Sequence, residues 1–129
     1  MYAIRGAVTV KKNKEKDIIG AVKTMIGKII AENNLKKEEI INFTFSTTDD
    51  LDVVYPGKAV REMGFTKTTI LCLQEMNVNN SLNKCIRVLL YINNDLDKDK
   101  VKHIYLNKAA KLRKDLNFIS EEQNNDNKI

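Results

Sequence analysis

Alternating apolar and polar positions predict where the strands of this chain lie. Over residues 2–10, Ile4, Val8 and Val10 fall on one side and Arg5, together with small residues, falls on the other. A period of two residues is typical of a strand with one buried face. Residues 41–46 show the same period and predict a second strand, and two more strands are predicted over residues 68–74 and 84–93.

Helical periodicity is clearest between Glu15 and Asn34, where isoleucine, valine and methionine recur every three or four positions. This spacing predicts one long amphipathic helix, for which Asn13 is a candidate N-cap. Pro56-Gly57 opens a shorter helical segment that ends at Gly64. The run 101–106 is compatible with either a strand or a helix.

The resulting order, β-α-β-α-β-β, favours the α+β class, with a mixed β-sheet packed on one long helix. The chain supplies only one good helix for a sheet that carries apolar residues on both faces. We therefore expect the second face to be buried against another subunit of a homo-oligomer. A single domain is expected over residues 1–117, followed by a polar, mobile tail over 118–129.

Length and composition describe an ordinary globular domain. The 129 residues are 43% hydrophobic and 30% charged, enough for a core without covalent staples. The first residues lack the apolar segment of a signal peptide, and the longest apolar run, 88–92, is far too short to span a bilayer. Cys72 and Cys85 are therefore expected to be reduced thiols in a cytoplasmic protein with no membrane partner.

The net charge of +5 comes mostly from scattered lysines, with 22 Lys and Arg against 17 Asp and Glu. Lysines cluster only over residues 11–16, with no aromatic residue among them, so a solvated segment is favoured over a nucleic-acid site. Arginine is scarce, because only Arg5, Arg61, Arg87 and Arg113 are present. In a lysine-rich chain each arginine can mark a place where a planar fork is needed, although chance placement explains the pattern slightly better.

Motifs for metal, phosphate or dinucleotide binding are missing from the sequence. The chain has one histidine, His103, and no Gly-rich loop or Cys-x-x-Cys pair, so we expect no metal and no cofactor. The acidic run 49–52 is read as turn caps. On these residues alone, Cys72 is more simply a buried thiol than a nucleophile.

Arg87 stands out because it lies in the most apolar predicted strand, residues 85–92. A guanidinium there needs an anionic partner, since an unpaired buried charge is costly. An ion pair with Glu75 and an anionic ligand explain it about equally well. With Arg5 on the first strand, and Lys58 and Arg61 on the short helix, it can converge on a small dianion.

Five segments, in the same order and at closely matching spacing, resemble the monofunctional AroH-type chorismate mutases. They are Ile4–Val10, Tyr55–Glu62, Cys72–Met76, Lys84–Val88 and His103–Ala109. The resemblance implies a homotrimer described as a pseudo-α/β barrel, with active sites between subunits. It also implies cofactor-free isomerisation of chorismate to prephenate by a Claisen [3,3] rearrangement, on the route to phenylalanine and tyrosine.

Site residues follow from this resemblance position by position. The main substrate contacts it implies are Arg5, Cys72, Glu75, Arg87 and Tyr105. A neighbouring subunit would contribute Tyr55, Gly57, Lys58 and Arg61, Leu71 would stand in the pocket wall, and Leu112 and Arg113 would lie near the pocket mouth. Four positions depart from the family pattern, and one residue is missing between Gly64 and Thr68. The four are Tyr55 in place of Phe, Gly57 in place of Ala, Leu71 in place of Thr and Lys114 in place of Pro.

Two alternative functions remain open on the sequence. A RidA-type enamine deaminase is also a small trimer that uses a strand arginine to hold a carboxylate, although the segments around Cys72 and Tyr55 argue against it. The second alternative is a non-enzymatic module that binds an anion or nucleic acid, which strong salt-sensitive retention on nucleic acid would support.

Overall fold

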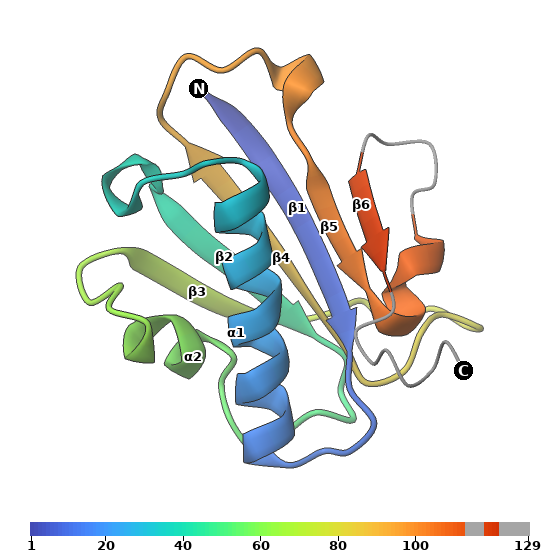
Figure 1. The fold of residues 1–129 in the computed structure, drawn as a ribbon. Coiled ribbons are helices and arrows are strands. Elements are labelled where there is room, and N and C mark those ends of the chain that lie inside the picture. Colours follow the sequence, from blue (N-terminus) through green and yellow to red (C-terminus); the bar gives the residue numbers. More distant parts are fainter. Residues whose placement is uncertain (113–117, 122–129) are drawn as a thin grey trace.

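The computed structural model describes residues 1–112 and 118–121 (Figure 1). Its strands are β1 (Tyr2–Thr9), β2 (Asn42–Thr47), β3 (Thr69–Gln74), β4 (Cys85–Ile92), β5 (His103–Leu106) and β6 (Phe118–Glu121). Its helices are α1 (Glu15–Glu32), α2 (Gly57–Glu62) and three short 3₁₀ turns, η1 (Lys37–Glu39), η2 (Lys98–Lys100) and η3 (Asn107–Lys111).

All six strands form one mixed sheet in the order β3-β2-β4-β1-β5-β6. Strand β4 runs antiparallel to both β1 and β2, whereas β5 is parallel to β1 and β3 is parallel to β2. Both α-helices lie on the same face of this sheet (Figure 1). The α+β class, with a mixed sheet packed on one long helix, is therefore confirmed.

Helix α1 is held to the sheet by the apolar stripe that the sequence predicted. The stripe residues Ile18, Val22, Met25, Ile26 and Ile29 are fully buried. Close packing occurs at Gly6 of β1, where an added Cβ would lie 2.9 Å from Ile29 Cδ1. Gly6 therefore brings the helix near the backbone of a central strand.

The N-terminus of α1 differs from the prediction. Lys14, rather than Asn13, is the N-cap residue, and no side chain caps the first turn. The Asn13 side chain instead donates to Asp52 Oδ1 at 2.8 Å and accepts the Asp52 backbone N–H at 3.2 Å. Asn13 is thus used to hold a distant loop rather than the helix beside it.

The C-terminal part of the sheet also adds to the prediction. The ambiguous run 101–106 contains strand β5, which pairs with β1 in the sheet interior. The first four residues of the expected tail form β6, which pairs in parallel with β5. The remainder of that tail lies outside the described residues. In the part that is described, none of the helices has both the length and the hydropathy that crossing a bilayer requires.

The sheet face opposite α1 and α2 carries exposed apolar side chains. Leu71 and Leu73 of β3 are 52% and 50% exposed, and Tyr91 of β4 is 45% exposed. β3 is also an edge strand, so its outer backbone groups pair with no other strand of the described sheet. Exposed apolar residues on an uncovered sheet face are typical of a surface that meets another chain.

Candidate active site

A row of directly opposed residues crosses the uncovered face of the sheet. Ser46 of β2 is opposite Arg87 of β4, which is opposite Ala7 of β1, which in turn is opposite Tyr105 of β5. Opposed residues project to the same face of a sheet. Ala7 has a small side chain, so the two large polar side chains on either side of it border a common space.

Glu75 joins this row from the end of β3. Its backbone N–H donates to the Thr47 carbonyl at 2.8 Å, which continues the pairing of β3 with β2 for one more residue. Leu73 is opposite Ser46, and two residues further on Glu75 projects to the same face. Four of the residues expected to contact substrate thus share one face of the sheet: Arg5, Glu75, Arg87 and Tyr105.

The contact between Arg87 and Glu75 is an ion pair but not a hydrogen bond. Arg87 Nε lies 3.5 Å from Glu75 Oε1, and the two side chains are 38% and 28% exposed. Arg87 Nε itself is buried and has no hydrogen-bond partner among the described residues. The same Glu75 oxygen accepts a hydrogen bond from the Ser46 hydroxyl at 2.5 Å. The ion pair, one of the two explanations that the sequence left open, is present, and Arg87 Nε is left without a hydrogen bond within the described part of the chain.

Arg5 lies one row along β1 from Ala7, opposite Leu89 of β4. Its side chain is exposed, and its backbone N–H donates to His103 Nδ1 at 2.9 Å. His103 therefore holds the backbone of a predicted site residue.

An apolar cluster supports the other end of the row. Ala7, Cys85, Tyr105 and Ala109 are buried together, and Leu112 packs against them. Tyr105 is only 3% exposed. Burial also raises the pKa of the Cys85 thiol to about 11, so this thiol stays protonated and packs as an apolar group. Tyr105 and Leu112 are thus fixed on the side of the row away from Glu75.

Cys72 and Tyr55 lie elsewhere. Cys72 is opposite Phe45, a fully buried residue, and packs against the core on the helix-bearing face. Together with Tyr55 it lines a cleft of about 550 Å³ between the loop that follows β2 and the end of β3. Within one chain the Cys72 side chain therefore projects away from the face that carries Glu75 and Arg87.

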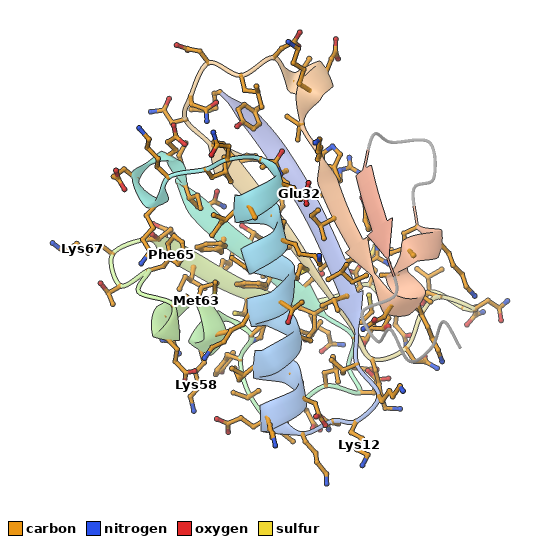
Figure 2. All side chains as sticks on the ribbon, viewed as in Figure 1. Lys12, Glu32, Lys58, Met63, Phe65 and Lys67 are labelled. Atoms are coloured by element: carbon orange, nitrogen blue, oxygen red, sulfur yellow. The ribbon has the colours of Figure 1, made fainter. Side chains whose placement is uncertain are left out.

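Helix α2 carries a second group of predicted residues. Gly57 begins the helix, and an added Cβ there would lie 2.7 Å from Ile70 Cγ2 and 3.5 Å from Cys72 Sγ. Lys58 forms an ion pair with Glu15 of α1, which raises the pKa of the lysine. Figure 2 shows Lys58 at the outer side of α2, directed away from the sheet. Arg61 is also exposed.

One chain thus presents the predicted residues in two groups. The uncovered face, here called the arginine face, carries Arg5, Glu75, Arg87 and Tyr105, with Leu112 beside it. The second group, here called the α2 side, contains Tyr55, Gly57, Lys58, Arg61 and Cys72. Leu71 is exposed at the β3 edge of the arginine face, where it is opposite Thr44. Arg113 lies outside the described residues.

Sequence reasoning missed Ser46 at the centre of the arginine face. It lies on the polar side of an alternating strand, so the sequence predicts only that its side chain faces away from the core. No sequence signal shows that β2 lies beside β4 in a register that sets Ser46 opposite Arg87. Among the described residues, no three His, Cys, Asp or Glu side chains are grouped to hold a metal ion.

Comparisons with known proteins give a consistent result. A family model described as chorismate mutase type I matches residues 1–116. The chorismate mutase AroH of Bacillus subtilis is 43% identical over 116 residues, which cover 89% of this chain and 91% of that protein. The chorismate mutase AroH of Thermus thermophilus is 36% identical over 114 residues, or 88% of this chain and 93% of that protein. The solved structure of a chorismate mutase from Clostridium thermocellum matches with a TM-score of 0.85 and 41% identity, over 87% of this chain and 100% of that chain.

Proposed function

The chain belongs to the type I chorismate mutase family and is an isomerase, and from this premise we propose how its residues convert chorismate to prephenate. Arg87 carries the proposal. Its Nε donor is buried without a hydrogen-bond partner among the described residues, on the sheet face that neither α1 nor α2 covers. A donor in that state favours an anionic or strongly polar ligand atom.

The reaction explains why few reactive groups are needed. An intramolecular [3,3] rearrangement breaks one C–O bond and makes one C–C bond without proton transfer or a covalent intermediate. Catalysis then rests on holding the enolpyruvyl chain in a chair-like conformer and on stabilising charge as it develops on the ether oxygen. The supporting cluster around Tyr105 favours a rigid row, as this kind of catalysis requires.

Each residue of the arginine face receives one role in this proposal. Arg87 donates to the ether oxygen as the C–O bond breaks, and Glu75 accepts a hydrogen bond from the ring hydroxyl. Arg5 and Tyr105 hold a substrate carboxylate, and Leu112 closes the apolar side. These roles agree with the charges of the groups and with their common face on the sheet.

The α2 side supplies its residues from a second subunit. Lys58 and Arg61 add positive potential that attracts the dianion, Tyr55 and Gly57 form pocket wall, and Cys72 supports the contact to the hydroxyl. Leu71, at the β3 edge of the arginine face, also forms pocket wall. The separation of the two groups within one chain supports a shared site. So do the exposed side chains of Leu71, Leu73 and Tyr91, which give the arginine face an apolar rim for a homotrimer contact.

Cellular context belongs to the same proposal. We place the enzyme in the cytoplasm, at the step that commits chorismate to phenylalanine and tyrosine in the shikimate pathway. Cys72 and Cys85 are both free thiols, which suits a reducing compartment. Neither an enamine deaminase nor a nucleic-acid module gains support, because the relatives compared above all carry the chorismate mutase name.

Loss of chorismate absorbance with the purified protein tests the activity. Mixing inactive Arg87→Ala subunits with inactive Arg61→Ala subunits tests the shared site, because mixed trimers contain some sites with neither substitution. We expect activity to return after subunit exchange, whereas each variant alone stays inactive. Absence of recovery, once exchange is verified by mass, would reject the shared site and leave the isomerase activity standing.

A further inference from the structure

The hydroxyl of Ser46 competes with Arg87 for one oxygen of Glu75. Ser46 Oγ donates to Glu75 Oε1 at 2.5 Å, whereas Arg87 Nε lies 3.5 Å from the same oxygen without forming a hydrogen bond. We infer that Ser46 is a positioning residue that prevents Glu75 from closing on Arg87. This inference rests on the proposed function, in which both charged groups contact the substrate.

The backbone of Glu75 is held in place, so this residue moves most easily by rotation of its side chain. Its N–H is fixed to the Thr47 carbonyl, and Ser46 and Arg87 are directly opposed on β2 and β4. Glu75 is therefore anchored beside both partners, and a change of rotamer decides which of them it binds. The short bond to the hydroxyl selects the open arrangement.

The open arrangement leaves Arg87 and Glu75 without a hydrogen bond to each other. Arg87 Nε keeps a free N–H, and the second Glu75 oxygen can accept a hydrogen bond from a ligand. Without the Ser46 hydroxyl, the carboxylate would gain a charge-assisted hydrogen bond by moving onto Arg87 Nε. A substrate would then have to break that pair before binding, so only the fraction of sites still open would be competent.

Ser46→Ala tests this competition, and Thr44→Val is its matched control. Thr44 lies on the same strand and the same face, opposite Leu89, and its hydroxyl accepts a hydrogen bond from Asn42 rather than from a charged group. Because the pair is partly exposed, we expect Ser46→Ala to raise KM roughly 3- to 10-fold. The kcat of Ser46→Ala, and both constants of Thr44→Val, should stay within about twofold of the unsubstituted enzyme.

A double substitution separates positioning from general damage to the strand. In a Glu75→Ala background no carboxylate can close on Arg87, so adding Ser46→Ala should leave KM unchanged. A merely structural role for Ser46 would give the same increase in both backgrounds. Equal increases would overturn the inference.

A readout independent of activity keeps the inference testable if chorismate is not turned over. The Nε–H resonance of Arg87 is assigned by its disappearance in Arg87→Lys. It should move downfield in Ser46→Ala, because it becomes hydrogen-bonded to Glu75, and stay in place in Thr44→Val. An unmoved resonance in folded Ser46→Ala would refute the positioning role. Lack of turnover by the unsubstituted protein would refute only the proposed function.

Discussion

Arg87→Ala separates a catalytic role of this arginine from a structural one. A catalytic role predicts a large loss of kcat with little loss of stability, and a structural role predicts the reverse. If Arg87 stabilises charge that develops as the C–O bond breaks, its removal takes away a preorganised donor, which typically lowers kcat by ~10²- to 10³-fold. Its structural contribution is small in comparison. The ion pair to Glu75 is 3.5 Å long and lies between side chains that are 38% and 28% exposed. Such a pair contributes below about 1 kcal/mol to stability.

The assay therefore needs two measurements on the same protein. Steady-state loss of chorismate gives kcat and KM, and thermal unfolding should show Tm lowered by less than about 4 °C. Arg87→Lys keeps the charge but loses the planar fork, so it should also be impaired, and partial rescue would show charge to matter more than geometry. A folded Arg87→Ala enzyme that keeps the oligomeric state of the unsubstituted protein and a near-normal kcat would refute the catalytic role and leave Arg87 as an ion-pair residue.

Arg5, Gly57 and Cys85 each allow a simpler test. Arg5→Ala should chiefly raise KM in steady-state kinetics, because a carboxylate held equally in both states contributes to binding and not to the barrier; a fall in kcat alone would contradict this. Gly57→Ala should lower the free energy of unfolding in urea by ~1–2 kcal/mol, since the new Cβ would lie 2.7 Å from the branched Ile70 side chain, and unchanged stability would refute the clash. Iodoacetamide at pH 8 should label no more than one thiol per chain by mass, because burial raises the pKa of Cys85 to about 11. The same shift should reduce stability as pH rises from 9 toward 11, where the unfolded thiol releases its proton first; stability constant over that range would contradict it.

Elements with strong local periodicity were predictable from the sequence. Helix α1 and strand β1 show their period over eight or more residues, and β4 is a long, almost wholly apolar run. Each lies within two residues of its expected bounds. Strand β5 has only four residues, too few to distinguish the period of a strand from that of a helix. Its pairing with β1 decides its conformation. β6 was missed for a related reason, since pairing with β5 supplies its hydrogen bonds.

The faces of the site were predictable, but the neighbours of each residue were not. Alternation alone sets Arg5 on the side of β1 away from the core, and the structure confirms that placement. In contrast, Ser46 and Arg87 are opposed across two strands that lie far apart in the sequence. Register between such strands depends on the packing of the whole sheet, which no local pattern records.

Arginine rather than lysine at position 87 follows from where its charge lies. The Nε of Arg87 is buried beside the protonated thiol of Cys85, on a strand whose other residues are apolar. A guanidinium there presents several N–H donors in a fixed planar fork, whereas an ammonium on a flexible stem does not. Lys58 has the opposite surroundings, since it is on the surface of α2 and paired with Glu15. The chain thus has a geometrically fixed charge on the arginine face, which suits the proposed task of stabilising charge as the C–O bond breaks. The charge of Lys58 on the α2 side is flexible and solvated, which suits the proposed task of attracting a dianion.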